Sequence, residues 1–133
     1  MAWHEQLIVN SATLIDKPII TIFMALVAVD VATGYIKSLC FHITNSSKGL
    51  QGLIKHSLVV LITLLSYPIL MAMNQEGWAV LWTTYYCVIY LVSIVENLGQ
   101  MGLPIPPIVK KYVYKLSDEY LHEKNEKEKG EQK

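Results

Sequence analysis

The chain has 133 residues, of which 53% are hydrophobic, so it is large enough for one domain and too small for two. Its eleven basic and eleven acidic residues balance, so the net charge indicates no particular partner. Seven of the eleven lysines follow residue 109, whereas Glu76 and Glu96 are the only charged side chains between Lys55 and Lys110. The mean hydropathy of the chain is +0.35. This uneven distribution of charge excludes an ordinary soluble domain and indicates a membrane protein.

Residues 1–17 predict a short amphipathic helix at the membrane surface with Trp3 at headgroup depth, although a frayed terminus would give the same pattern. No basic region or cleavage site of a removable signal peptide is visible. Residues 18–36 form the first apolar run, which only Asp30 interrupts. A helix of this length covers nearly ~30 Å at ~1.5 Å per residue, so it can cross a bilayer.

Small residues recur at helical spacing in this first span. Ala28 and Ala32 stand four residues apart, as do Asp30 and Gly34. Residues this small let a neighbouring helix approach closely. We therefore predict that this part of the span is a face for helix packing or assembly.

Two further spans follow. Residues 37–56, with three lysines and an Asn-Ser-Ser-Lys-Gly sequence, predict a polar connection to a second span at about residues 54–73. Residues 74–77 predict a four-residue turn, after which a third span at about residues 78–95 runs back antiparallel. The sequence therefore predicts an all-α membrane protein with three transmembrane helices.

The lysines also predict an orientation. The first connection carries three lysines, the second connection carries none, and the C-terminal segment carries seven. Because lysine-rich segments stay in the cytoplasm, we predict an N-out, C-in arrangement. The chain then divides into a membrane domain of residues 1–110 and a cytoplasmic part of residues 111–133, with an amphipathic helix and a charged tail.

Three charged residues fall at a similar depth in this arrangement, near the inner ends of the spans. A carboxylate among apolar helices is costly unless it is paired, so we predict that Asp30 pairs with Lys55. Glu96 competes for the same ammonium group, or lies among the lipid headgroups without a partner. The neighbouring Asn97 is expected to cap free carbonyls at the end of the third span.

No catalytic or ligand-binding pattern is present. The four histidines are scattered and have no metal-ligand spacing, and Cys40 and Cys87 lie far apart in the sequence, which argues against a disulfide or a zinc site. Gly99 and Gly102 match a nucleic-acid-binding Gly-x-x-Gly loop in letters only, because no strand–helix framework surrounds them. We predict a protein that is not an enzyme and binds no cofactor, metal or nucleic acid.

Two sequence blocks resemble a known family: the small phage holins of the toxin-secretion/phage-lysis type from phages and prophages of Gram-positive bacteria. The first block contains Asp30, Gly34, Lys37 and residues 45–55. The second block, the more specific one, contains Ser93, Ile94, Glu96 and Asn97 followed by a turn motif of Gly99, Gly102, Pro104 and Pro106. The resemblance covers about residues 19–110. It departs from many family members at Tyr90, where they carry an acid, so a second carboxylate role in this span is not expected here.

The resemblance implies a lysis protein of the bacterial cytoplasmic membrane. Such a protein accumulates in the lipid bilayer, oligomerises with copies of itself, and opens lesions that release or activate a phage endolysin. Relatives beside toxin genes are proposed to help export large toxins. The residues alone also allow a small transporter or ion-channel subunit that uses Asp30 and Glu96 as ion ligands, or a membrane adaptor whose charged tail recruits a soluble partner.

Overall fold

A computed structural model describes residues 2–42, 46–109 and 111 of the chain. These residues form helices and no strand, with bounds α1 Trp3–Ala12, η1 Leu14–Asp16, α2 Pro18–Cys40, α3 Ser46–Ala72 and α4 Glu76–Gln100. The helices α2, α3 and α4 are long and apolar enough to cross a membrane, which confirms the predicted all-α fold with three transmembrane helices. The predicted C-terminal helix and charged tail lie outside the described residues, apart from Lys111.

The three long helices extend beyond the predicted spans. α2 continues to Cys40 and α4 to Gln100, while α3 already begins at Ser46, inside the segment predicted to be a polar connection. Hydropathy reports which residues tolerate lipid, whereas a helix continues wherever its backbone hydrogen bonds can form. The helices are therefore longer than the predicted spans, whose membrane bounds stay a prediction, and the number of spans is confirmed.

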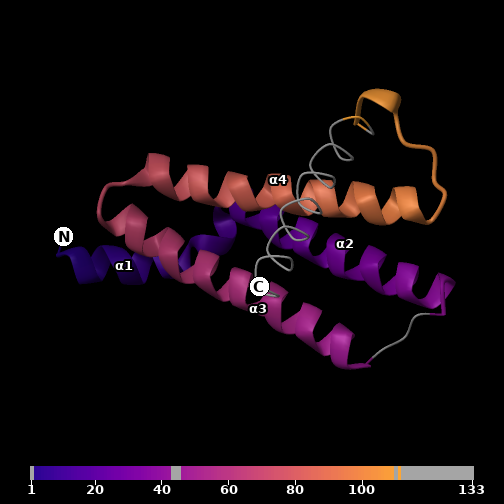
Figure 1. Cartoon of the computed structure of the whole chain (residues 1–133). Helices are drawn as coiled ribbons and strands as arrows, with labels where there is room; N and C mark the ends of the chain where they lie inside the picture. Colours follow the sequence, from indigo (N-terminus) through magenta and orange to yellow (C-terminus); the bar gives the residue numbers. More distant parts are fainter. Residues whose placement is uncertain (1, 43–45, 110, 112–133) are drawn as a thin grey trace, which may run out of the picture.

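Figure 1 shows how the helices are arranged. α2 and α4 run side by side along most of their length. The N-terminal half of α3, which begins at Ser46, diverges from α2. The end of α2, the beginning of α3 and the end of α4 share one end of the bundle, which we call the connection end. α1 lies against α3 at the opposite end, near the turn between α3 and α4. The tight turn there places Asn74 in the left-handed region at φ 58°.

Two small apolar clusters hold the helices together. Phe23 and Val27 of α2 pack against Cys87 and Tyr90 of α4, with the rings of Phe23 and Tyr90 edge to face at a centroid distance of 6.0 Å. A second cluster nearer to the turn end joins Ile20, Tyr67 and Ala79 of α2, α3 and α4. Aromatic pairs of this geometry stabilise by about 0.5–1.5 kcal/mol beyond their area burial.

Most of the apolar surface remains outside these clusters. In each spanning helix, at most 28% of the most apolar stretch is buried by the rest of the chain. Large side chains such as Leu61, Leu81 and Val88 are exposed. In a membrane this surface faces lipid tails or other helices, so the single chain leaves ample surface for further helix contacts.

Candidate functional site

A buried carboxylate lies in the middle of the contact between α2 and α4. Asp30 is only 4% exposed, and the side-chain amide of Asn97 donates a hydrogen bond to its Oδ1 atom at 3.3 Å. The same amide nitrogen lies 3.3 Å from the hydroxyl of Thr33. The hydrogen bond between Asp30 and Asn97, both predicted site residues, thus joins α2 and α4 through polar groups.

Lys37 forms the other side of this arrangement. Its ammonium group donates to Oδ1 of Asn97 at 2.7 Å, so the Asn97 amide connects a carboxylate to an ammonium group. Asp30 and Lys37 are seven residues apart and therefore lie on one face of α2. Asn97 was expected to cap helix carbonyls, but its side chain instead bridges α2 and α4, because it is buried in the helix contact rather than free at the helix end.

The predicted pair of Asp30 with Lys55 is wrong. Lys55 is exposed, and the next residue of α3, His56, lies against Asp30 with Nε2 at 3.9 Å from Oδ2. Nδ1 of His56 is 3.2 Å from the hydroxyl of Tyr90. One residue turns a helix by about 100°, so a shift of one position exchanges the inward for the outward side. Sequence reasoning missed His56 as the neighbour of Asp30, whereas the contact of Tyr90 agrees with the expectation that its deep hydroxyl bonds a neighbouring helix.

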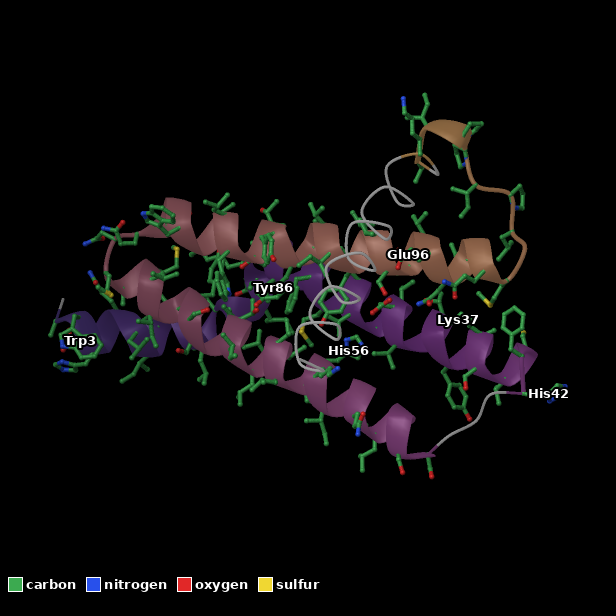
Figure 2. All side chains as sticks on the ribbon, viewed as in Figure 1. Trp3, Lys37, His42, His56, Tyr86 and Glu96 are labelled. Atoms are coloured by element: carbon green, nitrogen blue, oxygen red, sulfur yellow. The ribbon has the colours of Figure 1, made fainter. Side chains whose placement is uncertain are left out.

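Glu96 forms no hydrogen bond with the described groups of this network, although the ammonium group of Lys37 is near enough to interact electrostatically with its carboxylate. It is half-buried in α4, and among the described residues it forms no ion pair with Lys55 or any other cation. Figure 2 shows Lys37, His56 and Glu96 in the part of the bundle that lies away from Trp3. Because His56 adjoins Lys55 in the chain and lies against Asp30, the residues predicted at one depth (Asp30, Lys55 and Glu96) share this half of the bundle without forming the predicted ion pair.

The small residues of α2 separate into two faces. Gly34 faces α4, where a Cβ atom would meet Nδ2 of Asn97 at 3.6 Å, an ordinary van der Waals distance. Ala28 and Ala32 are exposed on the outer surface of α2, together with Ala25. The predicted assembly residues therefore comprise an inner part that packs within the chain and an outer part that the chain leaves uncovered.

The glycine–proline motif ends α4 and redirects the chain. Gly102 adopts φ +85°, and the amides of Gly102 and Leu103 donate to the carbonyls of Gly99 and Leu98 at 3.1 Å each. This is the pattern of a helix end that requires a left-handed residue. Ile105 then folds back over Gly99, where an added Cβ would lie 2.6 Å from its Cδ1 atom. Pro104 and Pro106 flank this residue and are exposed.

Gly102→Ala is expected to lower the free energy of unfolding by about 1–2 kcal/mol, because an alanine resists the left-handed conformation. Gly77→Ala is the matched control. Gly77 lies in the first turn of α4 with open space around it, so the same change there should be neutral or slightly stabilising. Denaturant unfolding in detergent micelles, followed by circular dichroism, measures both. Equal losses for the two variants would contradict this account of the turn.

A cavity of about 740 Å³ opens beside the polar network, between α2, α3 and α4. Its wall includes Asp30, Gly34, Gly49, Gly52, His56 and Asn97. These residues belong to the connection-end half of the bundle, where α3 diverges from α2 (Figure 1). The site thus combines a buried carboxylate, an imidazole and an amide with an open space among the spans.

Comparison with known proteins gives a family match over most of the chain. The profile described as "Bacteriophage holin family" matches residues 8–118. An uncharacterised protein of Halalkalibacterium halodurans is 29% identical over 101 residues, which are 71% of this chain and 75% of the relative. An uncharacterised protein of Clostridium perfringens is 26% identical over 107 residues, which are 77% of this chain and 77% of the relative. A second one, described as a 14.9 kDa protein in the nagH 3' region, is 27% identical over 107 residues, which are 77% of this chain and 79% of the relative. No solved structure matches the chain.

Proposed function

The chain belongs to the bacteriophage holin family, and from this premise we propose that it oligomerises in a bacterial cytoplasmic membrane and opens lesions that release a phage endolysin from the cytoplasm, so that the host cell lyses. The protein is a multi-pass protein of that membrane. The family match over residues 8–118 is the observation that carries the proposal. The large exposed apolar surface and the uncovered alanine face of α2 support it, because assembly needs helix surface that the single chain does not bury.

The weak forces between helices in lipid suit a timed event. Individual interhelical hydrogen bonds in membranes contribute on average about 0.6 kcal/mol, so an assembly held by packing and a few such bonds forms only above a threshold density. The protein then accumulates without harm until that density is reached. Inducible expression in a bacterial host with a co-expressed endolysin should give abrupt lysis after a delay. The endolysin alone should not lyse the cells, and the chain alone should arrest growth abruptly.

Two results would contradict the proposal. If the protein inserts into the membrane but causes no lysis with the endolysin, it is not a lysis protein. If leakage rises smoothly with the protein level, assembly has no threshold density. A transporter that uses Asp30 as an ion ligand makes a different prediction. There, Asp30→Asn abolishes ion flux while the protein still folds and no timed lysis occurs, whereas in a holin it changes the onset of lysis.

The proposed orientation has a direct test because Cys40 is exposed at the connection end of the bundle. If the N-terminus is outside and the C-terminus inside, a membrane-impermeant maleimide should not label Cys40 in intact protoplasts, but should label it after permeabilisation. The matched variant Gln75→Cys/Cys40→Ser moves the thiol to the exposed turn at the other end, and it should be labelled in intact protoplasts. The reverse pattern would establish the opposite orientation. Cys87 is buried and contributes little background.

A further inference from the structure

The cavity beside Asp30 arises from the path and the composition of α3. The residues of α3 that pack into the two apolar clusters begin at Val59, whereas those that line the cavity lie between Ser46 and His56. Gly49 and Gly52 face this space, and a Cβ atom added to either would meet nothing within 4 Å. The diverging first half of α3 and the missing side chains together leave the cavity open.

The cavity wall carries an acidic side chain and several other polar side chains, while most of its surface is apolar; the polar residues are Asp30, Ser38, Ser46, His56, Ser93 and Asn97. Asp30 is the one acidic residue among the described lining residues, and no lysine is among them. Val31, Tyr35 and Leu53 supply apolar and aromatic surface. A cavity of about 740 Å³ with a few convergent polar groups has the size and composition of a site for a small organic molecule.

The carboxylate of Asp30 keeps unused acceptor capacity. An ionised carboxylate offers about four acceptor positions, whereas the side chain of Asp30 receives one hydrogen bond from the described residues, at 3.3 Å from Asn97. The imidazole of His56 approaches to 3.9 Å, which is beyond hydrogen-bond distance. Lys37 reaches Asp30 only through the Asn97 amide, so the carboxylate still has room for a cationic group that donates hydrogen bonds to it directly.

We propose that this cavity binds a small organic cation, an alkyl- or cycloalkylammonium ion whose ammonium group donates to Asp30 and whose hydrocarbon part contacts Val31, Tyr35 and Leu53. A metal ion fits less well, because the described residues contain no group of three acidic, histidine or cysteine side chains that could hold one. An ammonium ion needs one carboxylate and a few acceptors, and its hydrocarbon body matches the apolar wall. The residues that line this cavity do not include the alanines of the face proposed for assembly.

The test uses the full chain in lipid nanodiscs and three probes of one shape: 1-adamantylammonium, the neutral 1-adamantanol and the anionic 1-adamantanecarboxylate. Isothermal titration calorimetry measures binding, and empty nanodiscs measure partition into lipid. The ammonium probe should bind saturably, at one per chain, and about tenfold or more tighter than the neutral probe, because a charge-assisted hydrogen bond is lost with the charge. Equal signals for the three probes, or no saturable signal, would overturn the proposal.

Two variants locate the site. Asp30→Asn should weaken binding of the ammonium probe about tenfold and remove the preference over the neutral probe. Gly52→Phe fills the cavity while leaving Asp30 in place, and it should abolish binding of all three probes. Its matched control is Gly77→Phe, because Gly77 also has open space around it but lies outside the cavity wall and should leave binding unchanged. If Asp30→Asn fails to fold, as judged by circular dichroism, the Gly52 and Gly77 pair decides alone; unchanged binding in Gly52→Phe would refute the site.

Discussion

Asn97→Ala is expected to lower the free energy of unfolding of the bundle by about 2–3 kcal/mol, more than any other single truncation in the polar network. Its amide contacts Asp30, Thr33 and Lys37, so its loss leaves a buried carboxylate without its hydrogen-bond donor. Leaving a buried polar group unsatisfied costs about 1–3 kcal/mol, and more when the group is charged. Denaturant unfolding in detergent micelles, followed by circular dichroism, measures the effect.

A double variant separates this mechanism from a simple loss of packing. Asp30→Asn removes the charge that Asn97 compensates, so Asp30→Asn/Asn97→Ala should be more stable than Asn97→Ala alone. Gln100→Ala is the matched control, because it truncates an exposed amide at the end of the same helix and should change stability by less than about 0.5 kcal/mol. If the two single losses simply add in the double variant, Asn97 does not act through the carboxylate.

The number and the type of the helices follow from the sequence because lipid imposes a simple rule. A segment that crosses a bilayer must satisfy its own backbone groups and present apolar side chains, so a long apolar run implies a spanning helix. The ends of the helices are not under that rule. Residues 46–53 are helical despite two glycines and a lysine, because the backbone continues the ladder that the following apolar residues establish.

The partners within the site depend on helix rotation, which the sequence specifies less well. Depth along the membrane can be counted from the sequence, and it correctly grouped Asp30 with residues near position 55 of α3. Rotation decided between neighbours at that depth, so His56 faces Asp30 and Lys55 faces outward. The seven-residue spacings of Asp30 with Lys37 and of Tyr90 with Asn97 mark the inward faces, and they were the available signal.

The same rotation explains why the small residues of α2 have two different roles. Gly34 shares the inward face with Asp30 and lets α4 approach, as its 3.6 Å distance to Asn97 indicates. Ala25, Ala28 and Ala32 lie on the outward face and contribute nothing to the two apolar clusters. A surface of small residues turned toward lipid gives little to the stability of a single chain but permits close contact with another helix.

Ala28→Leu/Ala32→Leu is therefore expected to impair assembly strongly while leaving the single chain intact. Two leucines on the outward face prevent close approach of a second helix, and a loss of about 1.4 kcal/mol per contact corresponds to a tenfold weaker association. The onset of lysis with a co-expressed endolysin should be delayed severalfold or abolished. Crosslinking in membranes should show fewer oligomers at the same protein level. Unfolding of the isolated chain in detergent should be unchanged, because both positions are exposed.

Thr84→Leu provides the matched control on a different helix. Thr84 is a small exposed residue of α4, so the change places a leucine on a lipid-facing surface that carries no small-residue stripe, although it adds less volume than the two alanine changes. It should leave the onset of lysis and the crosslinking pattern close to those of the parent chain. A delay of equal size in both variants would assign the effect to leucine on any lipid-facing surface of the chain. Normal timing of lysis in Ala28→Leu/Ala32→Leu would place the assembly surface elsewhere, because two leucines on this face of α2 prevent a second helix from approaching closely.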